Sequence, residues 1–401
     1  MTALHASAIS LQSTTQRQAA TAGARRIPEL DALRGFVAMV VVVHHLFVIF
    51  QAACVAYLPV PAYRLVDFVQ AQSKLAVLTF FVLSGYAIGL ATRINPPVTQ
   101  AATGAYAFRR VARIVPLYVF SLGWTAALGL IYGFHGPAFS LQTLLGNAVF
   151  LQTSLEAKGY WFEPFGRNGP YWSLSYEVFF YLILPVVLIA VRHKPVFGLG
   201  TRGQLLALGM VALIVSLVAN QIAPSPFSNF LGLWIVWLVG FVSVDLKRSA
   251  RAIVLVLAPV VLTGLGWLVL RELDRTSATL TDAFSGTVIA LLFALAAIWG
   301  KWDQFGIVRA ARHGFALLFE RIGKGSYALY LLHYPLLLAA RTVLGTANAI
   351  IFGVVGLVVL LPLFILIFCP WLERETGAIL HRIARRRGDR VRMTGHRVDQ
   401  P

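Results

Sequence analysis

Charged side chains are scarce in this sequence. Asp, Glu, Lys and Arg together make up 12% of its 401 residues, about half of the share that soluble domains carry. Hydrophobic residues reach 58%, and the mean hydropathy is +0.75. These values exclude a soluble enzyme and a disordered chain, and they predict an all-α, polytopic membrane helix bundle.

Cysteine is almost absent as well. The chain has two cysteines, Cys54 and Cys369, and both lie in apolar surroundings. Two distant thiols exclude a disulfide scaffold and a multi-cysteine zinc cluster, so each is interpreted as a small hydrophobic residue. We expect no metal site.

Acidic residues are far outnumbered by basic ones. The chain has 16 Asp and Glu against 34 Lys and Arg, which gives a net charge of +18. Such a surplus is typical of nucleic-acid-binding proteins, but in a membrane protein it also follows from the enrichment of Lys and Arg in cytoplasmic loops. The positions of the basic residues distinguish the two explanations.

Ten segments are long and apolar enough to cross a membrane, which takes about 20 residues. They are 33–52, 75–92, 114–133, 172–191, 204–220, 229–246, 252–270, 283–300, 325–342 and 348–370. If the N-terminus is cytoplasmic, 27 of the 34 basic residues fall on the cytoplasmic side, as the positive-inside rule requires. The shorter run 141–152 would reverse every later loop if it crossed, so we expect it to be a partial or interfacial helix. We therefore predict about ten spans with both termini cytoplasmic, and no nucleic-acid partner.

The two ends of the chain differ from its middle. Residues 1–27 contain no Asp or Glu and lack the apolar core of a secretory signal. We interpret them as a disordered cytoplasmic extension, with a transit peptide as the alternative. Residues 28–373 form the predicted membrane domain. Residues 374–401 carry eight arginines and form a basic cytoplasmic tail that suits anionic lipid headgroups.

Ionisable groups inside a predicted span are costly and usually functional. His44 and His45 lie in the first span, Glu177 in the fourth and His333 in the ninth. Arg34 precedes His45 by eleven residues, or three turns plus about 20°, so both lie on one helix face with His45 about 16 Å deeper. Their depths would allow His45, Glu177 and His333 to meet in one cavity, where an imidazole can act as a base and a carboxylate can orient it. A histidine can also simply bond a neighbouring helix, which we favour for His44 and leave open for His333.

Three further patterns accompany these residues. Arg110 and Arg113 are spaced to share a helix face at the start of the third span, with Arg109 nearby. Guanidinium groups bind phosphates well, although a plain topogenic cluster explains the three arginines equally well. The Ser84–Gly85 pair allows two helices to approach closely, and Trp172 fits the aromatic belt at a membrane interface.

In this order, the patterns resemble the motifs of the acyltransferase-3 family of integral-membrane acyltransferases, which includes O-acetylases of surface glycans. The similarity rests on Leu30 to Gly35 with His45, on Phe80 to Tyr86, on Arg110 to Arg113, on Trp172-Ser173-Leu174 with Glu177, and on Gly325 to Pro335. It extends from about residue 27 to residue 370. Many members have two carboxylates in the fourth block, where this chain has Glu177 alone.

The resemblance implies a multi-pass protein of the bacterial inner membrane. Such a protein moves an acyl group, most often acetyl, from acyl-CoA to a hydroxyl of a carbohydrate or glycolipid. The resemblance assigns catalysis to His45, Arg34 and Glu177, donor binding to Arg110, Arg113, Arg109 and Ser84, and acceptor binding to Trp172, His333 and Asp31.

Two questions stay open at this stage. His45 can take the proton of the attacking hydroxyl, or it can carry the acyl group itself. Loop 134–171, which contains several aromatic residues, is expected either to cover the sugar or to belong to the interfacial belt. A proton-coupled transporter or flippase of lipid-linked or anionic solutes is the alternative function.

Overall fold

The computed structural model describes residues 27–154, 157, 159–192, 199–244, 246, 249–275, 277–299, 315–344 and 360–379. Within these ranges the chain is almost entirely helical, and its one extended pairing is an isolated bridge between Gln152 and Phe162. Seven of the described helices are long and apolar enough to cross a membrane. The predicted all-α membrane bundle is therefore confirmed, while the count of ten spans and the side of the termini stay predictions.

The helices follow one another along the chain with short connections. They are α2 (Pro28–Ile49), α3 (Gln51–Tyr57), α4 (Val60–Ala71), α5 (Ser73–Thr92), α6 (Gln100–Ile131), α7 (Leu141–Ala148), α8 (Tyr171–Arg192), α9 (Thr201–Ile222), α10 (Pro226–Val242), α11 (Ala250–Glu272), α12 (Ala278–Trp299), α14 (Phe315–Gly323), α15 (Ser326–Leu344) and α17 (Leu361–Leu363). The 3₁₀ turns η1 (Pro137–Phe139) and η2 (Phe165–Arg167) lie between α6 and α8, and the π-helical turn η4 (Phe364–Phe368) continues α17 in a helical segment that ends at residue 379.

Nine of the ten predicted spans coincide with a helix, and 141–152 contains only the short helix α7. The first part of the tenth predicted span, 348–359, lies outside the described residues, as do 1–26 of the predicted extension and 380–401 of the predicted tail. One boundary is corrected. Helix α6 begins at Gln100, where the Thr99 side chain accepts the N–H of Ala102, so the arginines of the third span lie inside the helix rather than at its start.

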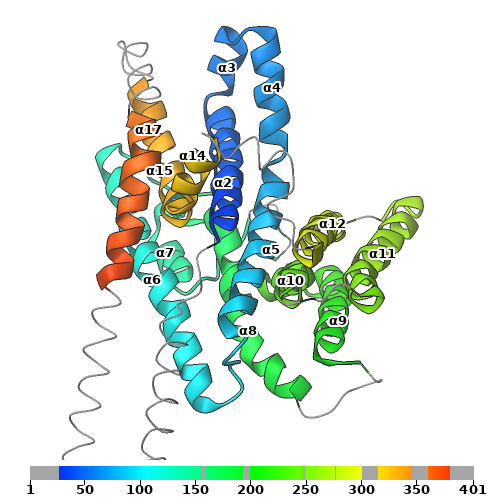
Figure 1. Ribbon diagram of the computed structural model, residues 1–401. Coiled ribbons are helices and arrows are strands. Elements are labelled where there is room, and N and C mark those ends of the chain that lie inside the picture. Colours follow the sequence, from blue (N-terminus) through cyan, green and yellow to red (C-terminus); the bar gives the residue numbers. More distant parts are fainter. Residues whose placement is uncertain are drawn as a thin grey trace, which may run out of the picture.

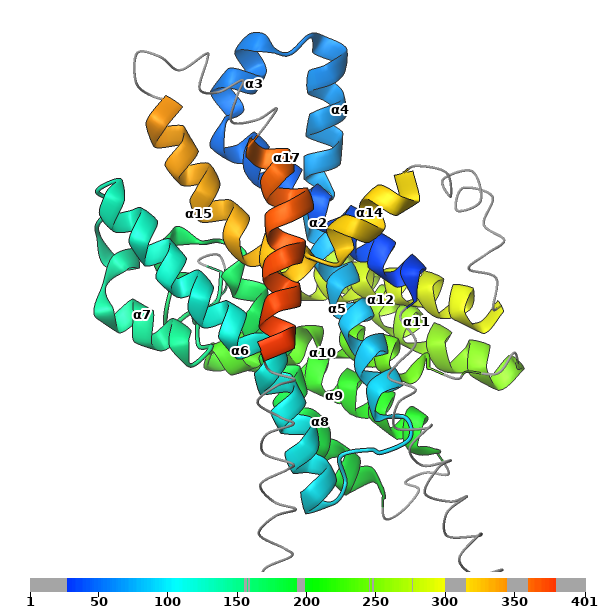
Figure 2. The same cartoon turned by 60° about the vertical axis from the view of Figure 1, so that its left-hand side comes forward.

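The helices form two groups on either side of α2 and α5 (Figures 1 and 2). Helices α9 to α12 lie on one side, and α6, α7, α15 and α17 lie on the other. Helices α3 and α4 form a hairpin that extends beyond the bundle in both views, a feature that the sequence did not predict. This division gives any site at the centre walls from both groups.

Close backbone contacts fix the central crossings. A Cβ on Gly85 of α5 would collide with the carbonyl oxygen of Trp237 on α10, and a Cβ on Gly240 would collide with that of Val82. Gly35 of α2 and Gly323 of α14 meet in the same manner. The expected close approach at Ser84–Gly85 is thus present, and small residues set the crossing.

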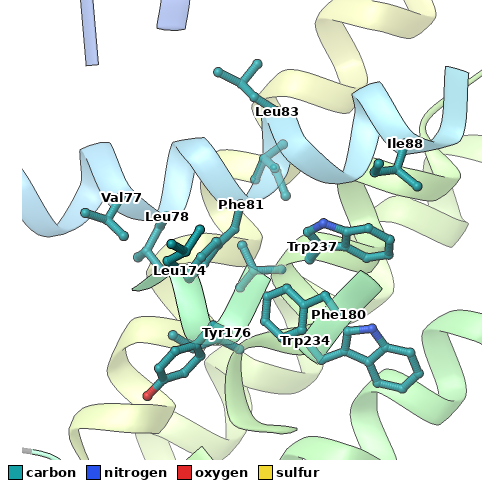
Figure 3. Close-up of a cluster of buried hydrophobic side chains, with 14 of the residues drawn as sticks. Val77, Leu78, Phe81, Leu83, Ile88, Leu174, Tyr176, Phe180, Trp234 and Trp237 are labelled. Atoms are coloured by element: carbon teal, nitrogen blue, oxygen red, sulfur yellow. The ribbon is translucent and has the colours of Figure 1, made fainter. Parts of the chain in front are cut away.

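The core at these crossings is built from large apolar side chains of α5, α8 and α10 (Figure 3). Phe81, Phe180 and Trp237 are buried against one another. The phenylalanine pair meets edge to face with ring centres 5.5 Å apart, a favourable geometry for aromatic rings. This rigid centre positions the polar groups described next.

Candidate active site

Two histidines from opposite ends of the sequence form a hydrogen-bonded pair. Nδ1 of His45 on α2 lies 3.0 Å from Nε2 of His333 on α15. Nδ1 of His333 lies 2.8 Å from the carbonyl oxygen of Leu329, and His333 is fully buried. The predicted meeting of the two imidazoles is therefore found.

The partners of the pair determine where its protons lie. A carbonyl only accepts hydrogen bonds, so Nδ1 of His333 donates to Leu329 and its Nε2 is the acceptor when the ring is neutral. His45 must then donate its Nδ1–H to that nitrogen. The lone pair of His45 is left on Nε2, which is the tautomer that a general base requires.

The free nitrogen of His45 faces the chain that leads into α8. A Cβ built on Gly169 would lie 3.9 Å from this Nε2, so the glycine keeps the space in front of the base open. The edge of Tyr334 packs against the His45 ring with centres 4.9 Å apart and holds the imidazole from another side.

A large cavity begins at His45. Its volume is about 1270 Å³, and its lining includes His44, His45, Lys74, Trp172 and Asp282. The lining comes from the first turns of α5, α8, α10 and α12 and from the last turns of α9 and α11. We call this end of the bundle the cavity end. The volume exceeds that of an ordinary small-molecule pocket, so a sugar-sized acceptor leaves ample room.

His44 has its own hydrogen-bond chain to α4. Its Nδ1 lies 3.0 Å from Oε1 of Gln70, and Nε2 of Gln70 donates to Asp67 over 3.0 Å. His44 therefore bonds a neighbouring helix, as favoured from the sequence, and it also lines the cavity. The chain ties the α3–α4 hairpin to the histidine pair.

An ion pair crosses the wall of the cavity. Nζ of Lys74 on α5 lies 3.0 Å from the Asp282 carboxylate on α12 and 5.6 Å from the centre of the Trp172 ring. Trp172, predicted to bind the acceptor, thus lines the cavity with a cation beside its ring. Charged and aromatic groups together suit an acceptor that carries hydroxyl groups.

The loop between α7 and α8 closes one side of the cavity. Three buried amides hold it: Asn147 donates to the Glu163 carbonyl, Gln152 to the Tyr171 carbonyl and Asn168 to the Leu331 carbonyl, over 2.8, 3.1 and 2.9 Å. The loop reaches the cavity through residues such as Pro170. Tyr160 and Trp161, singled out as sugar-stacking residues, are half exposed and do not line it.

Glu177 lies in a separate polar cluster. Its Oε1 accepts Ser84 Oγ over 2.7 Å and also accepts the Tyr181 hydroxyl, while Nε1 of Trp237 donates to Ser84 over 3.2 Å. These partners do not include an imidazole. Within the described contacts, His333 rather than Glu177 fixes the tautomer of His45.

A polar stripe on α8 connects the histidine pair with the arginines. Ser173, Glu177 and Tyr181 are four residues apart and therefore lie on one face over about 12 Å. Ser173 Oγ lies 2.6 Å from the hydroxyl of Tyr330, one turn before His333. Eight residues further along α8, the Tyr181 ring lies 5.9 Å from the Arg110 guanidinium.

The three arginines of α6 have different environments. Arg110 is partly buried, packs on the rings of Tyr106 and Tyr181, and has no hydrogen-bond partner for its Nε. Arg113 pairs with Glu373 over 2.5 Å. Arg109 is exposed. We call this region the arginine end, since it lies toward the start of α6 and the end of α8.

Arg34 is far from the base. It forms an ion pair with Asp31 over 3.3 Å within α2, and its Cα lies about 16 Å along the helix from that of His45. The structure therefore divides the predicted catalytic residues, because His45, Glu177 and Arg34 each have different partners. The described residues hold no group of three His, Cys, Asp or Glu side chains suited to a metal ion.

An imidazole base that faces a large polar cavity inside a membrane bundle fits an enzyme that activates a hydroxyl group. Residues 27–369 match the family model described as an acyltransferase domain, Acyl_transf_3. The chain therefore belongs to the acyltransferase-3 family and is an acyltransferase.

The curated relatives include Acyltransferase MdmB from Streptomyces mycarofaciens. It is 32% identical over 181 residues, which cover 43% of this chain and 41% of that protein. The aligned part is thus less than half of the relative's own length. No solved structure matches the chain.

Several residues of the site had no role in the sequence analysis. Tyr330 and Tyr181 complete the α8 stripe, and Gln70 holds His44. A signal was present for Tyr330, which falls three residues before His333 in the same block and thus on the same helix face. Gln70 lies in a segment without a clear apolar period and could not be identified.

Proposed function

We propose that the protein transfers an acyl group, acetyl in the first instance, from acyl-CoA to a hydroxyl of a carbohydrate or glycoconjugate in the cavity. The observation that carries the proposal is the chain from the Leu329 carbonyl through His333 to His45, because it leaves Nε2 of His45 unprotonated and directed toward Gly169. A neutral imidazole nitrogen at the mouth of a cavity is suited to remove a hydroxyl proton.

The proposed reaction needs one base and no external proton. Nε2 of His45 takes the acceptor's hydroxyl proton as its oxygen attacks the thioester carbonyl. The carbon–sulfur bond then breaks, and His45 returns the proton to the departing CoA thiolate. His333 accepts the Nδ1–H throughout and stabilises the imidazolium that forms in between. Transfer through an acyl-histidine would use the same nitrogen as a nucleophile.

The donor is proposed to enter at the arginine end. CoA carries several phosphate charges, and guanidinium groups recognise phosphate well. Arg110 supports this assignment, because its partly buried guanidinium has an unused donor. The α8 stripe supplies hydroxyl groups between Arg110 and the histidine pair, along which the polar pantetheine arm could hydrogen-bond.

The acceptor is proposed to enter from the cavity end. With the N-terminus in the cytoplasm, the positive-inside distribution assigns the arginine end to the cytoplasm and the cavity end to the outside. Donor and acceptor would then approach the base from opposite sides of the bacterial inner membrane. A transporter or flippase has no comparable support, since the chain is an acyltransferase by family.

Release of CoA by the purified full-length protein in detergent tests the proposal. Acetyl-CoA is supplied with and without a surface-glycan extract, for wild type, His45→Ala, Arg110→Ala and the control His135→Ala, an exposed histidine bonded to the Gly133 carbonyl. We expect acceptor-dependent release by wild type and the control, loss in His45→Ala, and a raised acetyl-CoA KM in Arg110→Ala. Equal release by His45→Ala and wild type would contradict the mechanism, and wild type that does not bind acetyl-CoA would contradict the donor.

A further inference from the structure

Glu373 is a buried carboxylate at the arginine end. Its side chain is 8% exposed, and it lies four residues beyond the last residue of the family match. Buried charges are costly unless they are well paired. Glu373 satisfies both oxygens: Oε1 lies 2.5 Å from Nη2 of Arg113, and Oε2 accepts the backbone N–H of Ala328 over 3.4 Å.

The contact joins three parts of the chain. Glu373 lies in the helical segment that continues α17, Arg113 lies on α6, and Ala328 is in the first turn of α15. The end of the α17 ribbon lies beside α6 in both views (Figures 1 and 2). Because α15 also carries His333, the carboxylate is anchored to a helix that the active site holds in place.

Arg113 remains accessible despite this partner. Its side chain is 55% exposed, and its guanidinium lies over the Tyr327 ring at 5.9 Å. The Tyr327 hydroxyl in turn donates to the Ile114 carbonyl over 3.1 Å. The guanidinium has five N–H donors, of which the carboxylate engages Nη2, so a phosphate can approach the others while Glu373 stays bound.

We propose that Glu373 sets the affinity for the anionic donor by acting as an internal anion on Arg113. The inference rests on the proposed function, in which the arginine end binds acyl-CoA. A phosphate at Arg113 would lie close to the Glu373 carboxylate and be repelled by it. Glu373 cannot swing away without leaving the Ala328 N–H and its buried position, so the repulsion persists in the complex and weakens donor binding.

A restrained affinity has a use for an enzyme that must release its product. CoA retains all the phosphates of acyl-CoA, so any contact to them holds donor and product equally. A carboxylate next to Arg113 lowers the affinity for both and thereby favours the departure of CoA after transfer.

Equilibrium binding of CoA to the purified full-length protein tests this role. Glu373→Gln removes the charge, and we expect CoA to bind about two- to fivefold more tightly, the range of a partly exposed ion pair. Glu375→Gln is the matched control, because it removes an equal charge two residues away from a carboxylate that pairs with Arg374 over 3.3 Å. It should leave binding unchanged. Arg113→Ala should weaken binding and abolish the gain from Glu373→Gln.

The outcomes separate this inference from the proposed function. If wild type binds CoA and Glu373→Gln binds it equally or more weakly, the inference is wrong and the proposed donor stands. If no variant binds CoA, both are wrong. Should Glu373→Gln not fold, Glu373→Asp withdraws the carboxylate from Arg113 by one methylene, and we expect a smaller gain; an unchanged affinity there would also overturn the inference. A purely structural role would reduce the folded fraction and leave the affinity of the folded protein as it was.

Discussion

Replacing His333 with phenylalanine removes both hydrogen bonds of the inner imidazole while keeping a ring of similar size. The Nδ1–H of His45 then loses its acceptor, and the Leu329 carbonyl loses its donor. A buried polar group without a partner costs about 1–3 kcal/mol. If the cost at His45 falls on the transition state, in which the imidazolium forms, kcat should decrease roughly five- to 150-fold.

His333→Gln is the matched variant. Its side-chain oxygen can accept the Nδ1–H of His45 near the position of the lost Nε2, so we expect it to retain most of the activity that phenylalanine loses. The assay is release of CoA at saturating acetyl-CoA and acceptor, normalised to folded protein. Wild-type kcat in His333→Phe, or equal losses in both variants, would refute the argument that His333 positions the base through this hydrogen bond.

Two further predictions concern packing and the acceptor. Gly85→Ala places a Cβ against the carbonyl oxygen of Trp237, and we expect the detergent-solubilised protein to lose about 1–3 kcal/mol of stability in a denaturation series; Gly123→Ala, whose Cβ would meet nothing within 4 Å, is the control, and equal losses would argue against a backbone contact. Lys74→Met breaks the ion pair to Asp282 and removes the cation beside Trp172. The acceptor KM should then rise roughly two- to fivefold with an unchanged acetyl-CoA KM, and a parallel rise in both would place Lys74 outside the acceptor site.

The apolar pattern predicts most of the fold because membrane helices must satisfy their backbone within one segment. Nine predicted spans coincide with helices for this reason. Helices α3 and α4 escaped prediction because 51–71 mixes polar and apolar residues. Exposed side chains such as Tyr57 and Phe68 show that burial does not impose a period on this hairpin.

The site was only partly predictable, because the rise of a helix gives depth and not direction. Counting residues correctly places His45 and His333 at a common level, and they meet. Glu177 lies on the face of α8 that meets Ser84, and nothing in the local sequence specifies which neighbour a face will contact. The partner of Arg113 follows it by 260 residues, a distance over which single-sequence patterns carry no information.

The walls of the cavity and the base come from different parts of the chain. Helices α2 and α15 supply the imidazoles, whereas α9 to α12 supply much of the remaining lining. Substitutions in those four helices can reshape the volume around the acceptor without moving either ring. The architecture thus makes substrate range adjustable separately from chemistry. A library that varies cavity residues such as Leu217, Gln221 and Leu233 would be the natural route to an enzyme that acylates a different alcohol.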